Sequence, residues 1–239
     1  MKLKQYIGRH RTNLVTYGVV ILGFVIMQVL SASHMLSSSV EGFLVPICAY
    51  VVLAVSLNLV VGISGELSLG HAGFMGVGAF TGIIVAALLK TVIASKVLLL
   101  IVAIVCGGVM AGLFGVVIGL PVMRLRGDYL AIVTLAFGEI LKNLINNMYV
   151  GSDANGVHFV IGTEKPLLAE GGSMVINGPM GATGVTKLAT FPIGFALILV
   201  TLFVVLNLIN SREGRAIKAV RDNRIAAESV GINVTAFRL

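Results

Sequence analysis

Ser211 to Val234 reads SREGRAIKAVRDNRIAAESVGINV, and it follows directly on an apolar run. From residue 211 to the C-terminus there are six basic residues against three acidic ones. An excess of basic residues beside an apolar span predicts a cytoplasmic position, by the positive-inside rule. Alanine and valine recur at helical spacing, Asp222 or Asn223 is suited to cap a second helix, and Gly231 is suited to end it. The stretch therefore predicts two short helices on the cytoplasmic face. Adsorption to anionic lipid is the simpler interpretation of such a basic segment.

The composition excludes a water-soluble fold. Hydrophobic residues make up 57% of the chain and charged residues 11%, whereas soluble domains carry about 25% charged residues. The net charge of +7 does not indicate nucleic acid as a partner, because the basic residues flank apolar runs instead of forming a stripe with aromatics. Cys48 and Cys106 lie inside apolar runs and match no metal or redox motif, so no disulfide is expected.

Six apolar runs approach the length of about 20 residues that crosses a bilayer, which predicts an all-α polytopic membrane protein. They are Leu14–Leu30, Phe43–Gly62, Leu69–Leu89, Val97–Leu120, Tyr129–Met148 and Pro192–Asn210. A cytoplasmic N-terminus places twelve Lys and Arg inside and four outside, with one more within a span. This asymmetry supports an even number of spans before Ser211.

The expected order along the chain is a cytoplasmic N-terminus (1–13), five transmembrane helices (14–148), an external loop (149–191), a sixth helix (192–210) and a cytoplasmic segment (211–239). A cleaved signal peptide is the alternative for the first run. That run is longer than an apolar signal region of about 7–15 residues, so an uncleaved helix is favoured. In the external loop, Val157–Ile161 and Ser173–Ile176 are expected to pair as a small hairpin.

Polar residues interrupt the apolar pattern between the second and third spans. Asn58, Glu66, Ser68 and His71 lie there among glycines. A cytoplasmic turn with Glu66 in water is one interpretation. The other is a broken helix whose backbone lines a transport pathway, because charged groups within a membrane normally face a cavity, a partner or water.

A second polar group lies in the fifth span. Glu139, Lys142 and Asn143 stand at i, i+3 and i+4, so they can pair on one helical face. Such pairing suits a purely structural role, while Glu139 is also a candidate for the transport pathway.

Three blocks together resemble a known family. They are GISGELSLGHAGFMGVGAFTG, RLRGDYLAIVTLAFGEILKNLINN and GRAIKAVRDNRIAAESVGINV. In this order they resemble the LivM-type permease subunit of bacterial branched-chain amino acid ABC importers, over about Val51 to Val234. INGPMGATG, from Ile176 to Gly184, resembles a glycine-rich external motif of the family. The segment between Asn147 and Ile176 is longer than the family pattern. Since the family continues with further membrane helices, the resemblance implies a chain truncated at Leu239.

The resemblance implies a multi-pass protein of the bacterial inner membrane that imports leucine, isoleucine or valine by alternating access. The implied partners are a second homologous permease, two cytoplasmic ATP-binding subunits, a periplasmic or extracellular solute-binding protein and membrane lipid. The chain has no GxxxxGK[ST] motif for ATP phosphates, so ATP hydrolysis is expected on other subunits, with no cofactor and no metal here. The residues expected to couple to the ATPases are Gly214, Arg215, Ala216, Ala226, Ala227, Glu228 and Gly231.

Two other functions remain open at this point. Permeases of urea and amide importers share these blocks, and the sequence does not separate their cargo from amino acids. A transporter or channel that works alone would use Glu66, His71 and Glu139 as an ion relay. An intramembrane enzyme finds no support, since the four histidines are scattered and neither HExxH nor GxSxG is present.

Overall fold

The computed structural model describes residues 2–33, 35–90, 92–122, 125, 128–153, 156–162, 166, 172–183, 185, 187–234 and 237. Within them, six helices are long and apolar enough to cross a membrane. They are α1 (Lys2–Ala32), α2 (Ser38–Asn58), α3 (His71–Leu89), α4 (Lys96–Val122), α5 (Asp128–Asn146) and α6 (Phe191–Asn210). The all-α polytopic fold is confirmed, and each of the six predicted spans falls on one of these helices. Helix α1 begins well before Leu14, and the other ends differ by a few residues. The chain divides into two compact units, Met1–Leu59 with Ala189–Ala219, and Val60–Leu188 with Val220–Leu239.

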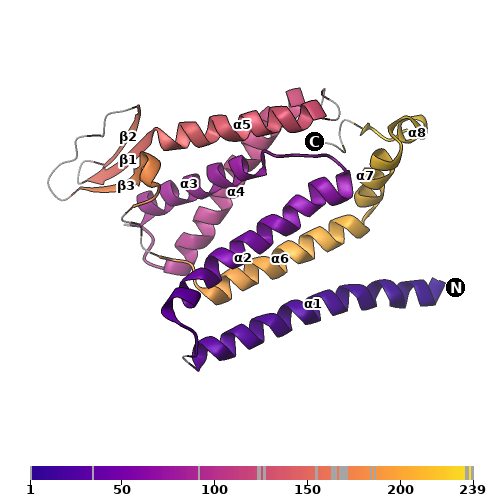
Figure 1. Ribbon diagram of the computed structural model, residues 1–239, viewed down its shortest axis with the longest axis horizontal. Coiled ribbons are helices and arrows are strands. Elements are labelled where there is room, and N and C mark those ends of the chain that lie inside the picture. The colour runs from indigo at the N-terminus through magenta and orange to yellow at the C-terminus, as the bar shows by residue number, and fades with distance from the viewer. Residues whose placement is uncertain are drawn as a thin grey trace. The chain divides into compact units, whose positions relative to one another are not determined.

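The first unit is built on the pair α2 and α6, which run side by side (Figure 1). Their core joins Cys48 to Ile198 and Leu202. Gly194 allows the close approach, because a Cβ at this position would lie 2.9 Å from the Cβ of Cys48. Helix α1 contacts α6, where Phe24 stacks on Phe195 with ring centroids 4.0 Å apart.

The second unit packs α3 against both α4 and α5. Helices α3 and α4 meet at glycines, since a Cβ at Gly107 would lie 2.5 Å from the carbonyl oxygen of Gly78. Helices α3 and α5 also approach through small residues, because a Cβ at Gly73 would lie 3.2 Å from the Cα of Gly138. Backbones that touch in this way pack closely without large side chains between them.

The chain between α2 and α3 is a broken helix. Helix α2 continues into a π-helix, Leu59–Ser64, and the chain then turns at Gly65, whose φ is +73°. Residues 65–70 lead into α3 without regular structure and are held to α5, where Thr134 Oγ1 accepts a hydrogen bond of 3.0 Å from the Leu69 N–H. The Thr134 hydroxyl in turn donates to the carbonyl of Ala131 at 3.0 Å. Both interpretations of this segment include a turn between two helices, so a role in lining a transport pathway stays a prediction. The buried side chain of Thr134 fixes the position of the turn.

A small antiparallel sheet follows α5, with strands β1 (Met148–Asp153), β2 (Gly156–Ile161) and β3 (Ser173–Asn177) in the order β2-β1-β3 (Figure 1). Both predicted strands exist, but the prediction that they pair with each other is wrong. Each pairs instead with β1, which begins at the last residue of the predicted fifth span and otherwise lies in the predicted external loop. Val150 and Ile176 are almost fully buried and pack with side chains of α3, so β1 takes the central place.

Candidate functional site

Two short helices follow α6, as predicted: α7 (Arg212–Asp222) and α8 (Arg224–Ser229). Ser211 makes the sharp turn into α7. Its hydroxyl donates to the carbonyl of Leu208 at 2.7 Å and accepts from the Gly214 N–H at 3.0 Å. A Cβ at Gly214 would lie 2.7 Å from the carbonyl oxygen of Ile209, so only glycine fits here.

The first turn of α7 is electrostatically favourable. The Glu213 backbone N–H, then the Ser211 hydroxyl and the neighbouring Arg212 and Arg215, hold the pKa of the Glu213 carboxyl below its ordinary value of 4.5. A carboxylate at a helix N-terminus also complements the helix dipole. Glu213 is therefore an anion at neutral pH and stabilises the start of this helix.

Helix α8 is capped at both ends. The Asn223 side chain accepts a hydrogen bond of 3.0 Å from the Ala226 N–H, and Gly231 follows the helix with φ +83°. Ala227 is buried on the inner face, whereas Ile225 and Val230 are 80% and 75% exposed. Helix α8 therefore packs through a small side chain and leaves two larger apolar side chains exposed.

The charged side chains of this segment have local partners. Arg215 donates to the carbonyl of Asn210 at 3.3 Å, and Glu228 lies 3.1 Å from Arg224 across one helical turn. Arg215 and Glu228 are both exposed. Exposed ion pairs of this kind contribute about 0–1 kcal/mol, so they leave both groups able to exchange partners.

Arg221 connects α7 with the broken helix. Its Nη1 donates to the carbonyl oxygen of Gly62 at 3.1 Å, while its Nε and Nη2 bond Asp222 at 3.0 and 2.9 Å. Its aliphatic stem covers Gly65, where a Cβ would lie 2.6 Å from the Arg221 Cγ. This contact joins positions 159 residues apart, so no local sequence pattern indicates it.

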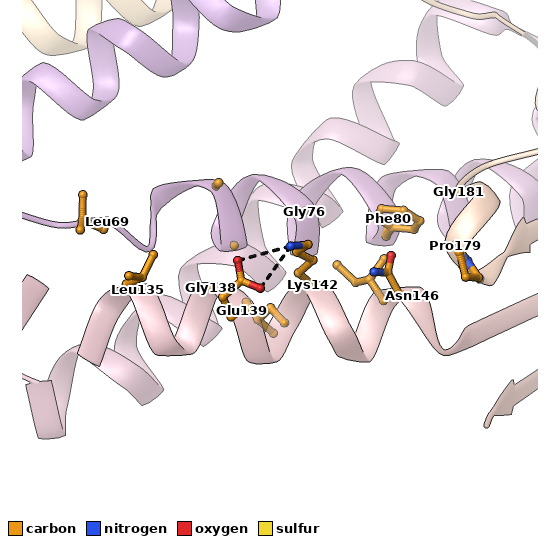
Figure 2. Close-up of a pocket in the computed structure, with 15 residues that line it drawn as sticks. Leu69, Gly76, Phe80, Leu135, Gly138, Glu139, Lys142, Asn146, Pro179 and Gly181 are labelled. Atoms are coloured by element: carbon orange, nitrogen blue, oxygen red, sulfur yellow. Dashed lines mark hydrogen bonds and ion pairs between the residues drawn. The ribbon is translucent and has the colours of Figure 1, made fainter. Parts of the chain in front are cut away.

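A cleft of about 390 Å³ lies between α3, α5 and the 3-10 turn η2 (Gly178–Met180). Figure 2 shows Glu139 and Lys142 on α5, with Gly76 and Phe80 of α3 opposite them. Lys142 Nζ lies 3.2 Å from Glu139 Oε2 and 3.4 Å from Oε1, so the predicted pairing is confirmed. Most of the other lining is apolar or glycine.

Comparison with known proteins identifies the family. The family described as "Branched-chain amino acid transport system / permease component" matches residues 39–239. This chain belongs to that family. It is 36% identical over 203 residues to the high-affinity branched-chain amino acid transport system permease protein LivM of Escherichia coli (strain K12). It is 34% identical over the same length to the LivM protein of Salmonella typhimurium.

Each alignment covers 80% of this chain and 45% of the relative, so the chain spans about half the length of the curated relatives it matches. No solved structure gives a significant match. With six helices long and apolar enough to span a bilayer, this member of the permease family is a multi-pass membrane protein.

The structure places the permease's seven expected coupling residues on α7, on α8 and in the turn after α8. Gly214 and Ala227 are buried there, and Ala216 is half-buried. The exposed ones are Arg215, Ala226, Glu228 and Gly231. Ile225 and Val230 were not among the expected coupling residues, although apolar residues within a strongly polar stretch can be recognised in the sequence. Whether any of them contacts an ATPase stays a prediction.

The five expected pathway residues lie on different elements. Glu139 lines the cleft. Asn58 is the last residue of α2, Glu66 and Ser68 lie in the broken segment, and His71 begins α3. Glu66, Ser68 and His71 are not part of the cleft wall. Their role in transport remains a prediction.

Proposed function

We propose that this chain is a transmembrane permease subunit of an ABC importer for branched-chain amino acids. The cargo assignment is supported by the resemblance to two proteins named for high-affinity branched-chain amino acid transport. The partners are a second homologous permease, two cytoplasmic ATP-binding subunits and a solute-binding protein on the outer side. The chain crosses the bacterial inner membrane with its N-terminus in the cytoplasm, as the distribution of Lys and Arg indicates.

The observation that carries the proposal is the contact of Arg221 with Gly62 and Gly65. Helix α8 exposes the apolar side chain of Ile225, and Val230 directly after it is also exposed; an ATPase subunit can bind these side chains. Arg221 then joins the end of α7 to the broken helix before α3. An ATPase that binds this surface differently in its two nucleotide states would favour one conformation of the helix break over another. The difference in its affinity for the two conformations limits how far their populations can shift. The pathway residues Glu66, Ser68 and His71 lie within or just after that break.

The test uses the complete importer in proteoliposomes, with uptake of radiolabelled leucine and ATP hydrolysis measured together. Replacing Arg215→Ala, Glu228→Ala or Ile225→Asp should lower uptake per ATP by about thirtyfold, because disrupting an interface hot spot costs on the order of 2 kcal/mol. The affinity for the solute-binding protein should stay unchanged. Ile225→Val is the matched control and should transport normally.

Normal coupling in all three variants would contradict the assignment of the coupling surface. Leucine uptake by the purified chain without any ATPase would instead establish a transporter that works alone. Competition of leucine uptake by isoleucine, valine, urea and acetamide separates the two importer classes. Inhibition by urea and acetamide but not by the amino acids would overturn the cargo assignment.

A further inference from the structure

The cleft between α3 and α5 combines two opposite charges with an apolar wall. Glu139 and Lys142 lie in the candidate membrane span Tyr129–Asn146 and are 56% and 63% exposed. The apolar lining comes from both helices and includes Leu69, Phe80, Leu135, Leu141 and Ile145. The volume of about 390 Å³ lies at the lower end of the range of about 300–1,000 Å³ for ligand pockets.

The turn η2 closes one end of this cleft. A Cβ at Gly178 would lie 2.8 Å from the carbonyl oxygen of Asn146, so the turn is seated directly on the last residue of α5. Gly178 belongs to the cleft wall, together with Pro179 and Gly181, which Figure 2 labels. In the proposed topology this end is external, so one end of the cleft lies on the side where cargo arrives.

The ion pair leaves bonding capacity on both partners. The Lys142 ammonium has three donors and directs its described bonds only to Glu139. The Glu139 carboxylate likewise accepts more hydrogen bonds than one ammonium supplies. Two adjacent opposite charges, each with unused hydrogen-bonding capacity, match the two charges of an amino acid zwitterion. A zwitterion needs both of its charges compensated before it leaves water.

We propose that the Glu139–Lys142 pair and the apolar wall of this cleft form a binding site for zwitterionic α-amino acids with apolar side chains. Lys142 binds the α-carboxylate, Glu139 binds the α-ammonium group, and the apolar lining receives the side chain. This proposal rests on the proposed function and assigns the cargo a place in this chain. It explains why a membrane span carries a full ion pair, which an i, i+3 contact worth about 0.2–0.5 kcal/mol in an isolated helix does not explain.

A single cysteine reports occupancy of the cleft without requiring transport. Ala72 lines the cleft and is exposed, so Ala72→Cys is introduced after the native thiols are removed by Cys48→Ala and Cys106→Ala. The rate of labelling by a small thiosulfonate is measured on this chain in the purified complex, with leucine, isoamylamine or isocaproate added. The two analogues keep the side chain of leucine, and each lacks one of its charged groups.

Leucine should protect Ala72→Cys from labelling at a concentration at least tenfold lower than either analogue requires. Glu139→Gln and Lys142→Met should each raise the leucine concentration needed for protection by about tenfold or more, the scale of one charge-assisted hydrogen bond. Lys187→Met, which removes an exposed lysine outside the cleft wall, is the matched control and should protect normally.

Two outcomes overturn the proposal. Equal protection by leucine and both analogues would show a cleft that recognises only apolar groups. No protection by leucine, in a complex that imports leucine with ATP, would place the cargo elsewhere while leaving the proposed function intact. The proposed function fails separately, if the unaltered complex does not import branched-chain amino acids at all.

Discussion

At the scale of single residues, the contact between Gly65 and Arg221 gives a sharp prediction. Gly65→Ala should destabilise the protein by about 1–2 kcal/mol from its positive φ alone, and the new Cβ should also displace the Arg221 side chain from Gly62. Uptake per ATP should then fall severalfold. Thermal unfolding and coupled transport are the measurements.

A double-mutant cycle separates the steric effect from the backbone effect. Gly65→Ala and Arg221→Ala should be non-additive, because the second change removes the side chain with which the first one collides. Gly231 offers a matched control, since its φ is +83° and a Cβ there meets nothing within 4 Å. Gly231→Ala with Arg221→Ala should therefore be additive in stability. Additivity in the Gly65 cycle would mean that the contact is unimportant.

At the scale of elements, α8 depends on its cap. A helix of six residues is too short to be stable by itself, and the Asn223 side chain supplies its N-terminal hydrogen bond. Asn223→Ala should cost about 1 kcal/mol and speed hydrogen exchange in α8, whereas Asn223→Asp should preserve protection. Unchanged exchange in the alanine variant would show that contacts other than the cap hold this helix.

The elements also show what the sequence can and cannot predict. Apolar content and length sufficed for the six spans, and local capping rules sufficed for α7 and α8. Strand β1 was missed because it lies across the boundary between the predicted fifth span, which ends at Met148, and the predicted external loop, and only pairing with β2 and β3 distinguishes a strand there. The contact of Arg221 with Gly62 depends on tertiary packing, so no periodicity reveals it. The pairing of Glu139 with Lys142 was predicted from their spacing on one helix, but the cleft that they line also depends on the packing of α3 against α5.

At the scale of the whole molecule, the predicted orientation places β3 outside and α8 inside the cell. The basis is charge, because twelve Lys and Arg fall on one side and four on the other. Ser173 on β3 and Ser229 on α8 are both exposed. Each can therefore be replaced by cysteine, after the native thiols are removed, with little expected effect on packing.

In intact spheroplasts a membrane-impermeant maleimide should label Ser173→Cys and spare Ser229→Cys, and permeabilisation should expose the second site. Labelling of both variants in permeabilised spheroplasts controls for differences in the intrinsic reactivity of the two cysteines. Labelling of Ser229→Cys in intact spheroplasts would place α8 on the outer surface, where no ATP-binding subunit can reach it. Because the proposed coupling requires a cytoplasmic motor to hold α7 and α8, that single result would remove the basis for energy transfer through Arg221.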